Sequence, residues 1–273
     1  ISRANNEYEA EVEWLFVNYA ITDDLELQAG KLRVPVYYYS EYMDVGIAYP
    51  WVRVPADAYS LDVTSFNGLQ LNHRTFFGGT SLTSTVYAGR AYSGATSELM
   101  TFLFDENIER EFTGLMGVGF EINTDATIAK VSFSTADLDE TRPTVALQND
   151  GTIEFLDVYL QQNFGPASIM LEYNEYDPFY KSYFVSGTYT IGKHTYYALY
   201  SKFDLDLPFE EHDTVSLGVR CNLGPRTAIK FDISTLTDEG VNPFAGNAPN
   251  PVNNDPDGDG DVTIFTTSLD FMF

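Results

Sequence analysis

The chain has 273 residues, and its 15 basic and 40 acidic side chains give a net charge of −25 at pH 7. A nucleic-acid partner is excluded, because binding to phosphates depends on Lys and Arg side chains that release counterions. An apolar fraction of 44% with 15% aromatic residues is too high for a disordered chain. We therefore expect a single folded domain over residues 1–273.

Cysteine content and hydropathy exclude further classes. With one cysteine, Cys221, the chain forms no intramolecular disulfide and offers no Cys-rich metal or redox motif. No stretch approaches the roughly 18 uncharged apolar residues of a transmembrane helix. The first residues carry neither an initiator Met nor a signal-peptide pattern. We therefore expect the chain to start after processing or after the true beginning of the protein.

Apolar and polar residues alternate with a period of two along most of the chain, as in β-strands with two different faces. From Tyr8 to Phe16, for example, apolar residues alternate with glutamates, which a helix would scatter around its circumference. The pattern predicts thirteen strands, each of about the length that crosses a bilayer when tilted. They cover residues 8–16, 25–37, 65–75, 82–92, 108–122, 127–134, 153–164, 168–176, 179–191, 195–204, 214–223, 227–235 and 262–273.

Short and long connections between these strands alternate along the chain. The long connections are residues 38–64, 93–107, 136–152, 205–213 and 236–261, and the short link at 177–178 is the one exception to the rule. Tight turns at one end and long loops at the other are typical of outer-membrane barrels. The sequence therefore predicts an all-β fold, a transmembrane antiparallel β-barrel.

The last strand indicates the orientation of the barrel. Phe265, Thr267, Leu269, Phe271 and the terminal Phe273 point to one side, and polar residues alternate with them. This pattern resembles the C-terminal strand of outer-membrane barrel proteins of Gram-negative bacteria. The resemblance implies a place in the outer membrane, with lipid and lipopolysaccharide as neighbours. It also implies short turns in the periplasm and long loops outside the cell.

Bacterial single-chain barrels have an even number of strands, so thirteen strands indicate that N-terminal strands are missing. The arrangement resembles sixteen-stranded porins, with 13 to 14 of the strands in this sequence. That resemblance implies a homotrimer in which the loop 38–64 folds inward and forms the constriction of the pore. The segment Gly30 to Val36, followed by three tyrosines, is similar to the strand end before this loop in porins related to the phosphate-selective type of gammaproteobacteria.

If the apolar residues of each strand face lipid, the opposite residues line a polar lumen with charges of both signs. In a constriction, basic residues of the wall would oppose acids of the inward loop and screen solutes by size and charge. Alternatively, these charges only solvate the lumen and support strand pairing. The candidates are Lys31, Arg33, Arg74 and Arg90 against Glu41 and Asp44, together with Glu11, Glu13, Lys130 and Arg220.

The predicted function is passive diffusion of small hydrophilic solutes and ions, without a cofactor. The excess of acids predicts a preference for cations or tolerance of zwitterions, although arginines of the wall could select a small anion locally. Aromatic residues of the lipid-facing set are expected to anchor at headgroup depth, and ordinary β-propensity is the alternative explanation. They are Tyr8, Trp14, Tyr87, Phe120, Tyr173, Tyr189, Tyr197, Phe203 and Phe273.

The last long loop contains a run of alternating aspartates, Asp255, Asp257, Asp259 and Asp261. The run resembles the start of an EF-hand calcium loop, although the twelfth position holds Thr266 and not Glu. A solvated acidic turn is the alternative. Calcium at this place could bridge to lipopolysaccharide phosphates, and a plugged barrel acting as a calcium-dependent surface or adhesion protein is the alternative function.

Catalysis is not expected. The three histidines fall on a lipid-facing position (His73), beside a periplasmic turn (His194) and in an outer loop (His212), so no Ser-His-acid cluster emerges. An outer-membrane lipase would have to use His73. A soluble lectin-like β-sandwich is a further alternative, and it predicts solubility without detergent. Cys221 lies on the lipid-facing set of its strand and is expected to be a small apolar filler.

Overall fold

A computed structural model describes residues 12–61, 63–93, 109–141, 151–206, 210–242, 248–249 and 261–272. Over these ranges the chain is all-β except for one 3-10 turn, η1 (Gly46–Ala48). None of the described helical residues forms a helix long and apolar enough to cross a membrane.

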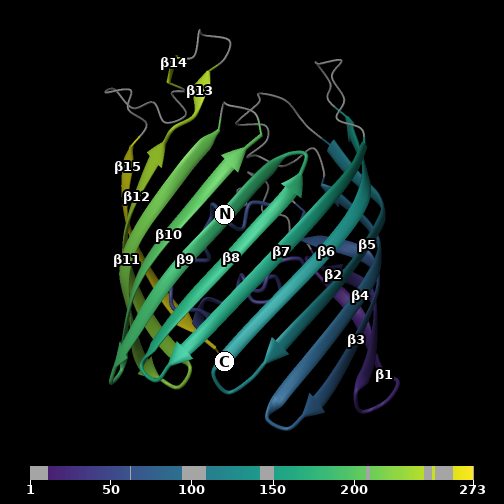
Figure 1. Ribbon diagram of the computed structural model, residues 1–273, viewed down its shortest axis with the longest axis horizontal. Coiled ribbons are helices and arrows are strands. Elements are labelled where there is room, and N and C mark those ends of the chain that lie inside the picture. The colour runs from purple at the N-terminus through teal and green to yellow at the C-terminus, as the bar shows by residue number, and fades with distance from the viewer. Residues whose placement is uncertain are drawn as a thin grey trace. The chain divides into compact units, whose positions relative to one another are not determined.

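Among the described residues, thirteen strands form one sheet, in which each strand pairs with the next one of this sheet along the chain (Figure 1). The predicted number of strands and their antiparallel order are therefore confirmed, although the first strand lies at residues 15–20 and not at 8–16 as predicted. The strands are β1 (Leu15–Ala20), β2 (Leu25–Arg33), β3 (Ser65–Phe77), β4 (Thr80–Ser93), β5 (Glu109–Asn123), β6 (Thr127–Thr141), β7 (Gly151–Phe164), β8 (Ala167–Asp177), β9 (Tyr180–Ile191), β10 (His194–Leu205), β11 (Glu211–Gly224), β12 (Thr227–Asp238) and β15 (Val262–Phe271). A second, small sheet pairs β13 (Val241–Asn242) with β14 (Ala248–Pro249).

Some strand ends differ from the prediction. β2 ends at Arg33 and not at residue 37, because Pro35 has no N–H to offer the ladder. The chain leaves the sheet there, and the N–H of Val34 donates to the carbonyl of Thr64 at 3.1 Å. β6 instead runs past its predicted end at residue 134, because buried and exposed residues continue to alternate up to Thr141.

The described strands divide into two compact units. The first unit consists of residues 1–36, 61–122 and 131–156, and it contains β1 to β4 and nearly all of β5. The second unit consists of residues 37–60, 123–130 and 157–273, and it contains η1, β8 to β12 and β15. Residues of β6 and β7 belong to both units.

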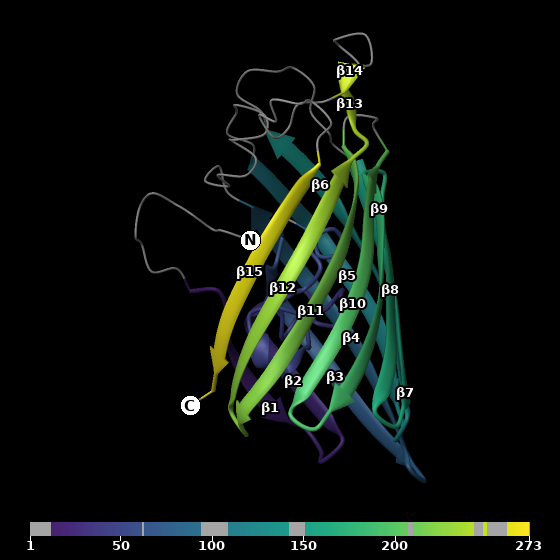
Figure 2. The same ribbon diagram turned by 90° about the vertical axis from the view of Figure 1, so that its left-hand side faces the viewer.

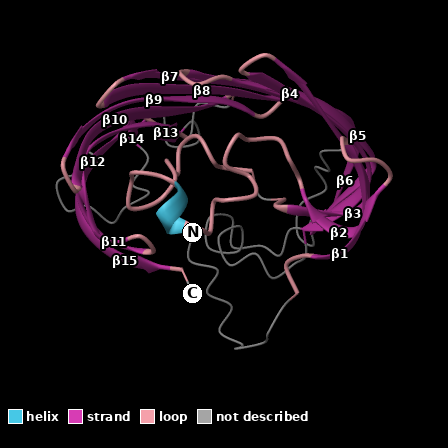
Figure 3. Ribbon diagram, turned by 90° about the horizontal axis from the view of Figure 1, so that it is seen from below, coloured by secondary structure: helices cyan, strands magenta, loops and turns pink. Residues whose placement is uncertain are grey.

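In the second unit, buried and exposed residues alternate along β8, β9 and β10. In β8, Met170, Glu172, Asn174 and Tyr176 are buried, and most of the residues between them are exposed. The buried face of β8 to β12 and β15 lies under residues 37–60, which are termed the inward loop, and Figure 3 shows η1 on this side of the strands. This face is termed the inner face. The opposite face exposes large apolar side chains, among them Ile169, Val185, Leu217, Phe231 and Leu269.

Tight turns join the strands of the second unit at one end, as Figure 2 shows for β9 to β12. Gly192, between β9 and β10, has a φ of 59°, and Gly165, between β7 and β8, has a φ of 65°. Side chains with a Cβ rarely adopt this left-handed conformation, so glycine suits these two-residue turns.

In the first unit, the buried face of the sheet carries mixed apolar and polar side chains. Phe66 of β3 lies opposite Leu32 of β2, and Gln70 of β3 lies opposite Gln28. Tyr87 of β4 packs against Phe66 with ring centroids 5.4 Å apart. A Cβ at Gly117 of β5 would overlap the ring of Tyr87, so a glycine is required where the tyrosine crosses that strand.

Candidate functional site

Basic side chains of the inner face hold the inward loop by its main chain. Lys130 of β6 donates to the carbonyl of Tyr37 at 2.6 Å. Arg220 of β11 donates to the carbonyls of Ile47 and Tyr49 at 2.9 and 3.0 Å. A loop away from regular structure must satisfy its carbonyls in some way, and these two cations do so here.

Lys230 of β12 is the most buried of these cations. Its ammonium group donates to the carbonyls of Gly46 and Trp51, and it lies 3.0 Å from the carboxylate of Asp270 of β15. It also lies 4.6 Å from the ring centroid of Tyr49. A buried charge is tolerated only when it is paired and hydrogen-bonded, and Lys230 meets both conditions.

A buried carboxylate fixes the first part of the loop. Glu172 of β8 accepts hydrogen bonds from the N–H of Tyr38, at 2.8 Å, and from the hydroxyl of Tyr59. Asp157 of β7 is fully buried beside it. The amide of Asn174 donates to a loop carbonyl at 3.0 Å. Side chains of the inner face thus bind both ends of the loop.

Asp57 fixes the end of the loop, and here the carboxylate belongs to the loop and its partners belong to the strands. It accepts a hydrogen bond from the hydroxyl of Ser201 at 2.6 Å, and it lies 3.3 Å from Nδ1 of His212. Burial works against ionisation of Asp57, but the hydrogen bonds from His212 and Ser201 outweigh it and hold its pKa below the ordinary value of 3.8. Asp57 is therefore ionised although its side chain is buried.

The underside of the loop is an aromatic cluster. Tyr38 stacks on Tyr159 of β7 with ring centroids 3.9 Å apart, and the indole N–H of Trp51 donates to Ser186 at 2.8 Å. Burial raises the pKa of Tyr39 and of Tyr49 to about 12, so both hydroxyls stay neutral. Most of these rings are buried, so they form a small hydrophobic core between the loop and the strands.

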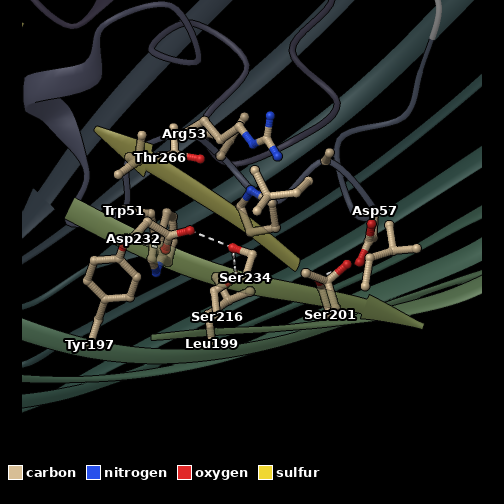
Figure 4. A pocket seen from close by; sticks show the side chains of 17 residues that line it. Trp51, Arg53, Asp57, Tyr197, Leu199, Ser201, Ser216, Asp232, Ser234 and Thr266 are labelled. Carbon is tan, nitrogen blue, oxygen red and sulfur yellow. Dashed lines mark hydrogen bonds between the residues drawn. The ribbon is translucent and has the colours of Figure 1, made fainter. Parts of the chain in front are cut away.

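A hollow of about 80 Å³ lies beside loop residues 51–57, over β10, β11, β12 and β15 (Figure 4). Asp232 stands in its wall and accepts hydrogen bonds from Tyr197, at 2.7 Å, and from Ser234. Arg53 of the loop lies across from these residues and is exposed. The remaining polar groups of the wall are mostly hydroxyls, from Ser201, Thr214, Ser216, Ser234 and Thr266.

Four of the predicted pore residues belong to the second unit. Lys130 and Arg220 lie on the inner face, and they bind the loop as described above. Glu41 and Asp44 are exposed on the inward loop. The basic residues predicted to oppose these acids, among them Arg33 and Arg74, belong to the first unit, so the opposed charges stay a prediction.

Three of the predicted basic residues lie on the other face of their strands. Paired residues in a sheet share a face, and Asn67 pairs with both Lys31 and Arg90, one position away from buried Phe66. The same register places Arg33 on that side. For Lys31 and Arg90 the predicted side is wrong, because apolar residues were assigned to lipid, whereas Phe66 is buried on the opposite face. Arg33 is only 8% exposed at the end of β2, and its role in the pore stays a prediction.

Arg74 and the N-terminal residues complete the predicted set. Arg74 shares a face with Gln70 and is exposed near the β3–β4 turn, where its side chain donates to Thr83 at 3.4 Å. Glu13 is half-buried, and Glu11 lies outside the described residues. Trp14 was expected to anchor in lipid, and the guanidinium of Arg33 lies 4.9 Å above its ring.

The expected aromatic anchors fall into two groups. Phe120, Tyr173 and Tyr189 are exposed as predicted. Tyr87, Tyr197 and Phe203 are instead only 4%, 5% and 6% exposed. For these three the prediction is wrong, since each ring packs against other side chains of its own unit. Tyr8 and Phe273 lie outside the described residues.

The histidines do not form a catalytic cluster among the described residues. His73 is exposed on β3, and His194 lies 3.2 Å from the sulfur of Cys221. His212 is on β11 and not in a loop as predicted. Asp57 contacts both Ser201 and His212, whereas a catalytic triad requires the histidine between the other two groups.

The predicted calcium ligands Asp255, Asp257 and Asp259 lie outside the described residues, and Asp261 is exposed just before β15. In the part of the chain that the structure describes, no three His, Cys, Asp or Glu side chains gather in a way that could hold a metal ion. Calcium binding therefore stays a prediction.

Arg53 and Asp57 were not predicted as site residues. Both sit in an irregular part of the loop, where no alternation of polar and apolar residues assigns a direction to a side chain. Their positions follow from the path of the loop.

No family model matches the chain, and no curated protein sequence matches it either. Solved structures do match. The anion-selective porin from Comamonas acidovorans aligns with a TM-score of 0.52 and 13% identity over 80% of this chain. OmpT, an outer membrane protein of Vibrio cholerae, aligns in its trimer form with a TM-score of 0.56 and 11% identity, over 97% of this chain and 82% of its own. The chain spans 65% of the length of the Comamonas porin.

The fold is that of an outer-membrane porin. A variant of OmpT with a loop deleted matches as well, with a TM-score of 0.52 and 12% identity over 92% of this chain and 77% of that one. The predicted fold class, a transmembrane antiparallel β-barrel, is thereby confirmed. The porin fold also agrees with the predicted location in the outer membrane of a Gram-negative bacterium.

Proposed function

We propose that the protein is a porin that lets small hydrophilic solutes and ions diffuse passively across the outer membrane. The observation that carries this proposal is the inward loop, which lies on the inner face and is bound there by Lys230, Arg220 and Glu172. A loop that is bound firmly to the strands can narrow a pore to a fixed width, as a size filter requires. The porin fold supports the same function.

The charges exposed on the loop support a preference for cations. Glu41 and Asp44 are exposed there, and Arg53 is the exposed loop cation. The whole chain carries −25 charges, which favours cations near the pore. The preference for cations belongs to the proposal, and an anion-selective protein shares the fold.

The partners are part of the same proposal. We place the protein among outer-membrane lipid and lipopolysaccharide, as a homotrimer, and the trimer form of OmpT supports that assembly. A catalytic role is not proposed, since Asp57, and not His212, stands between the groups that resemble a triad.

Conductance in planar lipid bilayers tests the function. The folded protein, reconstituted from detergent, is expected to produce stable steps of current that rise linearly with voltage. A salt gradient across the bilayer should give a reversal potential of the sign expected for cations. The shift in gel mobility on heating shows whether the protein is folded. Folded protein that inserts into the bilayer without steps of current would contradict the channel function. A reversal potential of the opposite sign would contradict only the preference for cations.

A further inference from the structure

The hollow beside the inward loop is lined by Arg53, whose guanidinium does not take part in holding the loop. Within the described residues, Arg53 has no hydrogen bond or ion pair, and its side chain is exposed at the edge of the hollow (Figure 4). Arg220 and Lys230 differ from Arg53 in this respect, because both donate hydrogen bonds to carbonyls of the loop. A guanidinium presents five donors in a planar fork that fits a carboxylate.

The opposite wall supplies an anion that has room for another donor. Each oxygen of Asp232 accepts one hydrogen bond, from Tyr197 on one side and from Ser234 on the other. An ionised carboxylate has about four acceptor positions, so about two are left for a ligand. Asp232 is half-buried, and it therefore stays accessible from the hollow.

Size and lining limit what can bind between these two groups. A water molecule needs about 10–15 Å³ of such space, so 80 Å³ holds about as many heavy atoms as a small amino acid. The hydroxyls of Ser216 and Thr266 can donate or accept. Leu199 and Ile264 add an apolar surface for a short side chain.

We propose that this hollow is a binding site for a small zwitterion, an α-amino acid of the size of alanine. Arg53 binds the carboxylate, Asp232 binds the ammonium group, and the hydroxyls complete the hydrogen bonds. A simple anion would lie near Asp232 and a simple cation near Arg53, so each is repelled by one of the two groups. The proposal rests on the proposed channel function, since it names a class of solute that the pore would favour.

The test compares three solutes of nearly equal size with the folded protein in detergent. Alanine carries both charges, propionate only the carboxylate, and ethylamine only the ammonium group. Isothermal titration should give saturable binding of alanine, and binding of the other two should be at least about tenfold weaker, the loss expected for one charged hydrogen bond. Equal binding of propionate or of ethylamine, or no saturable binding of alanine, would overturn the proposal.

Matched variants locate the site. Arg53→Gln and Asp232→Asn should each weaken alanine binding by about tenfold or more. Arg226→Gln and Asp204→Asn change exposed charges outside the hollow and should leave binding unchanged. If all four variants bind alanine alike, the hollow is not the site. Arg53 is exposed, so its variant is expected to fold even if Asp232→Asn does not. Conductance in salt alone is measured in parallel, and its absence would contradict the channel function and leave the binding result intact.

Discussion

The ammonium group of Lys230 lies 3.0 Å from the carboxylate of Asp270, in a pair that joins β12 to β15 directly under the inward loop. Lys230 is fully buried, and the same group donates to the loop carbonyls of Gly46 and Trp51. A single side chain therefore connects the last strand, its neighbour and the loop. Any change to this cation affects all three.

Replacing Lys230 by methionine keeps the length of the side chain and removes the charge. Asp270 then loses its partner and two loop carbonyls lose their donor, so we expect the unfolding free energy to fall by about 3 kcal/mol. Urea unfolding followed by tryptophan fluorescence measures this loss. The control is Lys181→Met, because Lys181 is exposed and pairs with Glu175 at 3.3 Å, so its loss should lower the unfolding free energy far less. Equal losses for the two variants would contradict the role of Lys230.

Gly46 has no room for a side chain. A Cβ at this position would overlap the carboxylate of Asp270, which is held in place by Lys230. Gly46→Ala is expected to destabilise the protein by about 1–3 kcal/mol, the usual cost of overpacking. Gly187→Ala is the control, since a Cβ there meets open space. Thermal unfolding that is the same for both variants would show that the loop can move away from Asp270.

Stability should depend on the ionisation of Asp57 at low pH. Its pKa is lower in the folded state than the ordinary 3.8, so ionised Asp57 stabilises the fold above that pH, and the contribution is lost as the pH falls through the lower value. We expect the wild type to lose more stability than Asp57→Asn between about pH 4 and pH 2. Urea midpoints at each pH measure the difference. Asp204→Asn should follow the wild type, and an Asp57→Asn curve parallel to the wild type would refute the prediction.

The register of β3 and β4 predicts which side of the sheet Arg90 occupies. Arg90 lies on the face opposite Tyr87, whereas Thr266 of β15 lines the hollow. In a background without Cys221, a charged thiol reagent should change the conductance of Thr266→Cys and leave that of Arg90→Cys unaltered. Single-channel recording before and after the reagent makes the comparison. A similar change in both variants would mean that the face assigned to Arg90 is incorrect.

The strands were predictable because their signal is local. Alternation along β8 to β10 places one residue in two on each face, and the structure reproduces those segments to within a few residues. The end of β2 was misjudged because alternation continues through Pro35, whereas the missing N–H ends the ladder earlier.

The facing of the side chains was less predictable. The rule that apolar residues face lipid works where the inner face meets water, and it fails where that face packs against protein. Tyr197 and Phe66 are apolar or aromatic and nevertheless buried on the inside. Arg90 was assigned to the wrong face for the same reason.

The sequence by itself determined most of the strands and the alternation of short and long links, since each depends on neighbouring residues or on a period of two, and its resemblance to porins pointed to the fold. The tertiary structure decided the site. Lys230, Asp57 and Arg53 acquire their roles from the path of an irregular loop across several strands, and contacts between residues more than a hundred positions apart leave no local pattern to read. Only that packing distinguishes the charges that bind the loop from the exposed charge of Arg53.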